Sequence, residues 1–386
     1  MKKIIFLVLP EKGHINPYIG PAQALQKNGN RVSFASIGNI SEQIEKAGLE
    51  FDLSLVSKKA PEQPMRGKEL VDLVNNKIAM KKWIQSLLLN VSKEDVTRQL
   101  DWLKLVRPDV LVIDPLAYTS VIAAELSGIP WVSMSNSLNP VLEGDVTSDL
   151  LDTLQEIRIQ RDKLFQTFDV KVDFKGCDAL SKYLTIAFCT PEFVGERGSD
   201  VHMVGPSLPI KNRGDETVVI ENNEELTIYA SFGSQIFYWP EIFEKLMTAT
   251  QGENWRLILS VGDLIEKLQK PDHVTLYRYA PQLEILPKST LFITHGGANS
   301  VMESIYFQTK LWVTPMCNDQ FHQGHYVNKS GIGLVEDIRK LSTIQIKERI
   351  KQILNSREIE TNINRVARSY QIDGSRKSAE LIEALI

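Results

Sequence analysis

Short apolar runs alternate with helical segments along the chain, and this alternation limits the possible folds more than any other feature. In the first half, apolar runs with the length and composition of strands occupy 4–9, 31–36, 110–113 and 131–134. Segments with helical spacing of apolar residues occupy 19–28, 40–46 and 118–127. Strands that alternate with helices form parallel sheets. We therefore predict an α/β fold with a parallel, doubly wound sheet in this half.

The second half repeats the same scheme. The pattern predicts strands at 226–230, 256–261, 274–278, 291–294 and 311–313, and helices at 239–248 and 298–307. The chain has 386 residues, more than the ~250–300 at which a single hydrophobic core stops growing. Together these observations predict two Rossmann-like domains that face each other across a cleft.

The join between the two predicted domains lies in the segment 205–223, where Pro, Gly, Asn and charged residues cluster without periodicity. We therefore assign residues 1–207 to the first domain and 208–365 to the second. Residues 366–386 form an amphipathic segment that predicts a final helix.

Composition excludes several classes of protein. The chain has 44 basic and 48 acidic residues and a net charge of -4, which argues against a nucleic-acid partner. No run of ~18 apolar residues occurs, so no transmembrane helix is predicted, although peripheral contact with a membrane stays open. The apolar run 4–9 is too short for a signal peptide. Cys177, Cys189 and Cys317 follow no metal or redox spacing, which suits reduced thiols in the cytoplasm.

A candidate anion site follows the predicted strand 291–294. A glycine pair lets the backbone turn there into a helix, whose first N–H groups and dipole bind anions. A His before the glycines and an Asn-Ser pair after them can add donors, and a Glu one turn later shares their helix face. This arrangement predicts a phosphate site with a carboxylate at ribose distance. The residues concerned are His295, Gly297, Asn299, Ser300 and Glu303.

Each of these residues also has an ordinary structural interpretation. A single His after a strand is usually a core or capping residue, and a glycine pair is usually a turn. A strand, a His, two glycines, an Asn-Ser pair and a Glu at helical spacing rarely coincide, so the combination favours a binding site.

The segment 279–320 resembles the donor-binding motif of the UDP-dependent glycosyltransferases. These are the large inverting family, of GT-B architecture, that includes plant flavonoid and bacterial macrolide glycosyltransferases. Two further segments match in the same order: Gly13-His14-Ile15-Asn16-Pro17 and Arg107-Pro108-Asp109-Val110-Leu111-Val112-Ile113-Asp114. The resemblance covers essentially the whole chain, and it implies that the final helix in 366–386 crosses back to the first domain, as in relatives of this two-domain type.

The resemblance implies a role for each donor-side residue. Tyr279 would stack on the uracil ring, where the family usually has Trp. Ala280 and Gln282 would hold the base edge and the ribose. Residues matching the diphosphate ligands are His295, Gly297, Asn299 and Ser300, with Gly233 and Ser234 in a second loop that approaches the phosphates. Glu303 matches the ribose ligand, and Asp319 and Gln320 match the pair that binds the sugar hydroxyls.

On the acceptor side, the resemblance implies that His14 is the general base and that Asp114 holds and charges its imidazole. The residues agree with this reading. His14 follows the first predicted strand in a glycine-containing loop, and Asp114 ends the predicted strand 110–113. Ligands bind at the carboxyl edge of open α/β sheets, where these two strand ends can meet. An imidazole with an unperturbed pKa near 6.5 suits proton abstraction near neutral pH.

The function implied is inverting transfer of a hexose from a UDP-sugar to a hydroxyl of a small hydrophobic or aromatic acceptor. An Asp-Gln pair at 319–320 often accompanies glucose in relatives. No Asp-x-Asp pair occurs, so we expect no metal, and we expect no cofactor because the UDP-sugar is a co-substrate. The segments 54–98 and 145–168 are the candidates for the acceptor pocket. A nucleotide-sugar epimerase and a non-catalytic nucleotide-sugar-binding subunit remain alternatives on the same scaffold.

Overall fold

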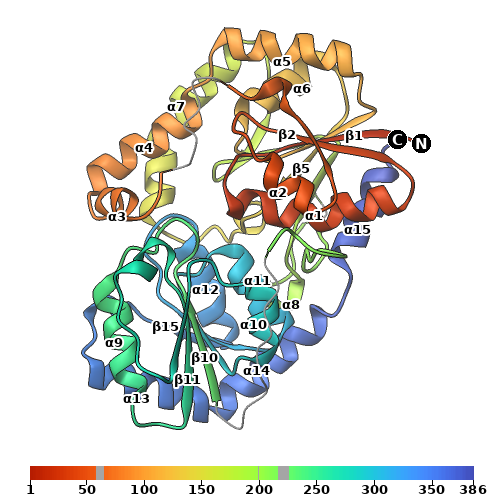
Figure 1. Cartoon of the computed structure of the whole chain (residues 1–386). Coiled ribbons are helices and arrows are strands. Elements are labelled where there is room, and N and C mark those ends of the chain that lie inside the picture. Colours follow the sequence, from red (N-terminus) through yellow and green to blue (C-terminus); the bar gives the residue numbers. More distant parts are fainter. Residues whose placement is uncertain (58–64, 199, 216–225) are drawn as a thin grey trace.

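The computed structural model describes residues 1–57, 65–198, 200–215 and 226–386. The part of the predicted join at 216–225 therefore lies outside the described residues. Two parallel sheets, one above the other in Figure 1, each carry helices on both faces. This confirms the predicted α/β fold with two parallel sheets.

The first sheet has seven strands among the described residues, in the order β3-β2-β1-β4-β5-β8-β9, and all neighbours are parallel. Its central strands are buried on both faces, as expected for a sheet covered by helices. The bounds are β1 Lys3–Leu7, β2 Arg31–Ala35, β3 Glu50–Asp52, β4 Val110–Ile113, β5 Trp131–Ser135, β8 Leu184–Ala187 and β9 His202–Met203.

Helices cover the first sheet and also extend from it. The insertion between β3 and β4 carries α3, α4 and α5, and α7 lies against α4. In Figure 1, α3 and α4 reach from the first domain to the second, and the Gly67 N–H donates to the Gln235 carbonyl across this contact (2.7 Å). The bounds are α1 Lys12–Lys27, α2 Ser41–Lys46, α3 Lys68–Val74, α4 Lys77–Leu89, α5 Lys93–Val106, α6 Tyr118–Ser127, α7 Asp149–Gln166 and α8 Pro191–Val194, with a hairpin of β6 Asp173–Lys175 and β7 Asp178–Leu180.

The second sheet is also fully parallel, in the order β12-β11-β10-β13-β14-β15. The strand bounds are β10 Leu226–Ser231, β11 Trp255–Ser260, β12 Val274–Tyr277, β13 Leu291–Thr294, β14 Lys310–Val313 and β15 Gly333–Val335. The helix bounds are α9 Pro240–Thr250, α10 Gln282–Ile285, α11 Ala298–Tyr306, α12 Gln320–Ser330, α13 Thr343–Asn355 and α14 Arg357–Ser369.

The last helix, α15 (Gly374–Glu383), packs against α1 of the first domain. It is the blue helix beside red α1 in Figure 1. The Glu383 carboxylate accepts hydrogen bonds from the Asn28 and Asn30 side chains (3.0 and 2.6 Å). Gly20 of α1 lies so close to Leu208 and Ser375 that a β-carbon there would overlap both. The end of the chain thus ties the two domains together.

Helix α1 begins at Lys12, and the prediction that it begins at residue 19 was wrong. His14 accordingly lies in the first turn of α1 and not in a loop. Pro17 and Pro21 argue against a helix in the sequence because each lacks the N–H that would bond the carbonyl four residues earlier. In the structure, the Gly13 carbonyl freed by Pro17 accepts from Asn136 and Asn299 (3.2 and 3.0 Å). The Pro17 carbonyl freed by Pro21 accepts from Ser207 Oγ (2.5 Å).

Candidate active site

A cavity of about 330 Å³ lies between the two sheets, at the carboxyl ends of their strands. Open α/β sheets bind ligands at this edge. Both domains line it, and so do the insertion helices α3 and α4. The predicted site residues that line it are His14, Gly233, Ser234, Tyr279, Ala280, Gln282, His295, Gly297, Asn299, Ser300, Glu303, Asp319 and Gln320. Asp114, the remaining predicted site residue, lies behind His14.

His14 and Asp114 meet because β1 and β4 are neighbours in the first sheet, with Leu7 paired to Ile113. His14 Nδ1 lies 2.6 Å from Asp114 Oδ2. The Asp114 side chain is fully buried, whereas that of His14 is 22% exposed. The other Asp114 oxygen accepts the Leu116 N–H (3.0 Å). The buried carboxylate thus fixes the orientation of the imidazole and leaves Nε2 free to face the cavity.

The charges around His14 favour its protonated form. Burial alone would lower its pKa, but the charge and hydrogen bond of Asp114, with further contributions from Glu11 and Asp319, raise the pKa to about 9. Asp319 reaches this imidazole from the second domain, and burial raises the pKa of its carboxyl while the charge of His14 lowers it. A pKa of about 9 favours a protonated His14 at neutral pH.

Two glycines make room for His295 at the ends of β10 and β13. A β-carbon at Gly233 or Gly297 would lie 2.8 or 2.7 Å from His295 Nε2, closer than packed atoms approach. Gly233 also has φ +83°, a backbone conformation that residues other than glycine rarely adopt. Burial lowers the pKa of His295 to about 4. The ring is therefore neutral and can give one N–H to a ligand beside the free N–H groups that begin α11.

Glu303 is already engaged on both carboxylate oxygens. Arg213 Nη1 donates to Oε1 and Gln282 Nε2 donates to Oε2, each at 2.6 Å. Arg213 also donates to Asp215 Oδ2 (2.5 Å), and its side chain is only 7% exposed. A carboxylate has about four lone-pair positions, so Glu303 can still accept from ribose hydroxyls while this network orients it.

Two cationic side chains of the first domain contact Tyr279. Arg66 donates to its hydroxyl, and Lys12 Nζ lies 4.9 Å from the centre of its ring. Burial lowers the pKa of Lys12. Ala280 follows directly, and its N–H donates to Ser260 Oγ (3.3 Å). A nucleobase stacked on the ring face that Lys12 covers would contact the ammonium group of Lys12.

Asn299 and Gln320 form hydrogen bonds with other groups of the protein. Asn299 Nδ2 donates to the Gly13 carbonyl, beside His14 (3.0 Å). Gln320 Oε1 accepts the backbone N–H groups of Met316 and Cys317 (2.8 and 3.0 Å). Ser300 Oγ lies 3.5 Å from Gln282 Nε2. These contacts place Asn299 between the two domains, and the Gln320 amide nitrogen donates to Cys317 Sγ (3.5 Å).

The end of the cavity that the first domain forms is lined mostly by apolar side chains. Its wall comes from α3, α4, α7 and the loop after β4, through Leu70, Met80, Trp83, Ile84, Leu87, Leu88, Leu116 and Leu150. Asp178, at the start of β7, places a buried carboxylate there. Its oxygens accept from Ser135 Oγ and Asn139 Nδ2 (2.5 and 2.7 Å), and burial raises its pKa to about 6. Both insertion segments named from the sequence thus contribute to this wall.

Among the described residues, no group of three or more His, Cys, Asp or Glu side chains is arranged to hold a metal ion. Within the same residues, every helix is too short or too polar to span a bilayer. The described cysteines Cys177, Cys189 and Cys317 are buried and free.

Comparison with known proteins shows what the chain is similar to. The sequence model of the family described as UDP-glucoronosyl and UDP-glucosyl transferase matches residues 216–373. The chain is 24% identical over 402 residues to the NDP-glycosyltransferase YjiC of Bacillus subtilis (strain 168), a match that covers 100% of this chain and 98% of the relative. It is also 24% identical to the oleandomycin glycosyltransferase of Streptomyces antibioticus, covering 96% of this chain and 88% of the relative. Residues 216–373 thus match this family, and the whole length of the chain is similar to curated glycosyltransferases.

Solved structures show the same fold as this chain. The structure titled as the glycotransferase of kitacinnamycin matches with a TM-score of 0.76 and 18% identity, covering 100% of this chain and 99% of that one. CalG4, the calicheamicin glycosyltransferase, matches with a TM-score of 0.76 and 17% identity, covering 100% and 98%. The two-domain architecture is therefore GT-B.

Sequence reasoning missed several polar residues that line the cavity or contact its lining. Arg213 and Asp215 lie in the segment interpreted as a join, and Arg213 meets Glu303 from 90 positions away. Asp178 lies in a hairpin that the pattern did not predict, and Lys12 and Arg66 come from the first domain to a site assigned to the second. No local signal identifies these residues, because each acquires its role through a partner distant in the sequence.

Proposed function

We propose that this glycosyltransferase moves a hexose, glucose in the first instance, from a UDP-sugar to a hydroxyl of a small hydrophobic or aromatic acceptor, with inversion at the anomeric carbon. One observation carries the proposal: the imidazole of His14, held 2.6 Å from the buried Asp114, lines the same cavity as the glycine turn around His295. A base and an anion site on opposite walls suit a direct displacement between two bound substrates.

In the proposed reaction, His14 Nε2 removes the proton of the acceptor hydroxyl. The acceptor oxygen bonds to the anomeric carbon from the face opposite UDP, the bond from that carbon to the diphosphate oxygen breaks, and UDP leaves with the electron pair. Asp114 stabilises the imidazolium that forms. The N–H groups that begin α11 and the neutral His295 would meet the charge on the diphosphate, so the reaction as proposed uses neither a metal nor a cofactor.

The identity of the donor rests on different residues. Glu303 and Gln282, joined at 2.6 Å, would hold the ribose, and Tyr279 would stack on uracil. Asp319 and Gln320 lie at the start of α12, at the cavity, and the Asp-Gln pair supports glucose as the donor sugar.

We also propose that the protein acts in the cytoplasm, where free cysteines such as the buried ones of this chain stay reduced.

We predict that His14→Ala loses most transfer activity and still binds UDP. A positioned general base contributes ~10²- to 10⁴-fold to a rate, and the removed imidazole contacts none of the predicted uridine ligands. Transfer is measured by mass spectrometry with UDP-glucose and a panel of phenolic and macrolide acceptors, and UDP affinity by calorimetry. His202→Ala is the matched control, because His202 is exposed on the edge strand β9.

Comparable turnover of an ordinary alcohol acceptor by His14→Ala and by the wild type would refute the assignment. The same assay separates the alternatives. An epimerase would convert UDP-GlcNAc with no acceptor present, and a non-catalytic subunit would bind UDP without any acceptor gaining the mass of a hexose.

A further inference from the structure

Helix α12 connects the donor end of the cavity to the first domain. It begins at Gln320, directly after Asp319, and both residues line the cavity. One turn on, the fully buried His322 lies against the first domain, with its Nε2 2.9 Å from Ser148 Oγ, the N-cap of α7. Farther along, α12 meets a group of first-domain residues around Glu143. A single helix therefore touches the proposed sugar site and the acceptor half.

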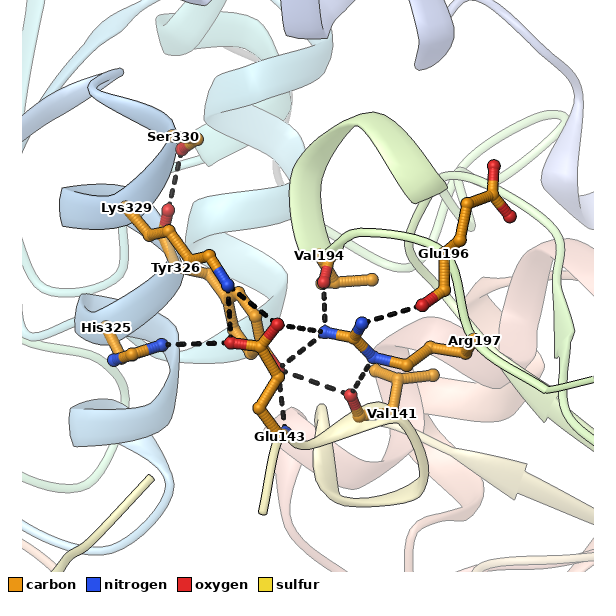
Figure 2. Close-up of polar contacts among 9 residues, drawn as sticks. All are labelled: Val141, Glu143, Val194, Glu196, Arg197, His325, Tyr326, Lys329 and Ser330. Atoms are coloured by element: carbon orange, nitrogen blue, oxygen red, sulfur yellow. Dashed lines mark hydrogen bonds and ion pairs between the residues drawn. The ribbon is translucent and has the colours of Figure 1, made fainter. Parts of the chain in front are cut away.

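The contacts at the far end form a compact polar cluster, shown in Figure 2. We name it the Glu143 cluster, and it comprises Glu143, Arg197, His325, Tyr326 and Lys329. Glu143 and Arg197 belong to the first domain, and the other three residues are on α12. The Glu143 carboxylate accepts from Lys329 Nζ at 2.7 and 2.6 Å and from Arg197 Nη2 at 3.0 Å, and it lies 3.5 Å from His325 Nε2.

The centre of the Glu143 cluster is buried. Tyr326 is 0% exposed, and every hydrogen bond of its hydroxyl goes to the other domain. The hydroxyl donates to the Val141 carbonyl (3.2 Å) and accepts from the Glu143 N–H and from Arg197 Nη2 (3.1 and 3.3 Å). A buried polar group without a hydrogen-bond partner costs more free energy than an exposed one. The Tyr326 hydroxyl therefore favours the domain arrangement in which all three hydrogen bonds are made.

Burial distinguishes the Glu143 cluster from an ordinary surface ion pair. Exposed pairs contribute little because water screens them and their side chains must be ordered. Lys329 is 52% exposed, but the Glu143 side chain is 20% exposed and that of Arg197 17%, and the guanidinium also donates to the Val141, Val194 and Glu196 carbonyls. Arg197 thus holds the carboxylate from the side of the first domain.

Glu143 belongs to the same segment as the acceptor-side lining. Asn136, Ser137 and Asn139 line the cavity a few residues earlier in the chain. We propose that Glu143 is a positioning residue for glycosyl transfer: it fixes α12, and with it Asp319 and the donor sugar, relative to the acceptor segment and His14. The inference rests on the proposed function, since it assigns what Glu143 contributes to that reaction. Small errors in the relative position of two reacting groups reduce rates steeply.

The test compares Glu143→Gln, Lys329→Met and the double variant. We expect kcat for transfer to fall between about tenfold and a hundredfold in each single variant, because misplacement by ~1 Å can cost that much. UDP affinity should stay unchanged, since the proposed uridine ligands are elsewhere on the second domain. The double variant should lose no more than Glu143→Gln alone, because both substitutions remove one interaction.

Hydrogen exchange provides a readout that does not depend on turnover. We expect amides in 139–146 and 322–330 to exchange faster in Glu143→Gln than in the wild type. Tyr326→Phe is a second variant that keeps every charge and should show the same pattern. The matched control is Glu253→Gln: Glu253 is 24% exposed and pairs with Lys347 and Lys351 at 2.8 Å, but within the second domain.

Unchanged kcat or unchanged exchange in Glu143→Gln would overturn the inference, and so would an equal loss in Glu253→Gln. Weaker UDP binding together with a lower melting temperature would also overturn it, because Glu143 would then only stabilise the fold. A wild type that transferred no sugar to any acceptor would refute the proposed function, while the exchange measurement would still decide whether Glu143 holds the domains together.

Discussion

The protonation state of His14 sets the pH range of the proposed reaction. Asp114 and the neighbouring carboxylates raise the pKa of His14 to about 9, so roughly one molecule in a hundred carries the neutral base at pH 7. We predict that kcat/KM rises with pH from 7 and levels off above about 9. Initial rates at subsaturating substrate across this range measure the inflection.

The control for this profile is Asp114→Asn. Removing the carboxylate removes the largest contribution that raises the pKa of His14, so the inflection should move to lower pH while the plateau rate falls. An inflection near 9 that persists in Asp114→Asn would show that another group titrates.

We predict that Glu303→Ala weakens UDP binding by an order of magnitude or more. A hydrogen bond to a charged group contributes ~1.5–3 kcal/mol, and the substitution also leaves Arg213 without its partner. Calorimetry with UDP measures the effect. Arg213→Met is the companion variant, since it keeps the carboxylate and removes only the group that orients it. Unchanged UDP affinity in Glu303→Ala would remove this carboxylate from the ribose.

Residues that belong to a contiguous motif could be predicted from the sequence. His295, Gly297 and Glu303 lie within one turn-and-helix segment, so their spacing alone brings them to one place. Arg213 could not be predicted, because its contact with Glu303 exists only when the join folds back over the second domain. The contact of Asn299 with Gly13 was missed for the same reason, since it forms only when the two domains meet.

Among the elements, the strands with the strongest apolar signal were predicted best. The runs 110–113 and 291–294 coincide with β4 and β13 as observed. Strands β3, β9 and β15 have only two or three residues, and pairing with a neighbouring strand defines them more than their own composition does. A short edge strand of this kind leaves almost no pattern in the sequence.

Helix α1 shows why local rules failed at one important boundary. The predicted helix began at residue 19, whereas the observed helix also includes Pro17, although proline inside a helix removes a hydrogen bond. Asn136 and Asn299 compensate for the first freed carbonyl and Ser207 for the second. Those compensations come from other parts of the chain, so His14 acquires its helical position through tertiary contacts.

At the scale of the whole molecule, the sequence predicted two domains but not the side-chain contacts that hold them together. The contacts that join them are single side chains spread over the chain, such as Asn299, Tyr326 and Glu383. Each is an ordinary polar or aromatic residue in its own segment. Their common role follows from the arrangement of the domains, which hydrophobic periodicity does not encode.

The packing of α15 on α1 supplies the last prediction. Gly20 of α1 faces the Leu208 carbonyl and Ser375 Oγ, and a methyl group there would overlap both atoms. Overpacking of this kind costs about 1–3 kcal/mol, so Gly20→Ala should lower the melting temperature and speed hydrogen exchange in α15. Gly13→Ala is the matched control on the same helix, because nothing lies within 4 Å of its β-carbon. Alanine favours a helix by ~0.8–1.0 kcal/mol over glycine, so this control should melt no lower than the wild type. If Gly20→Ala had the same melting temperature as Gly13→Ala, the contact between α1 and α15 would accommodate a methyl group. That contact would then not hold the two domains together.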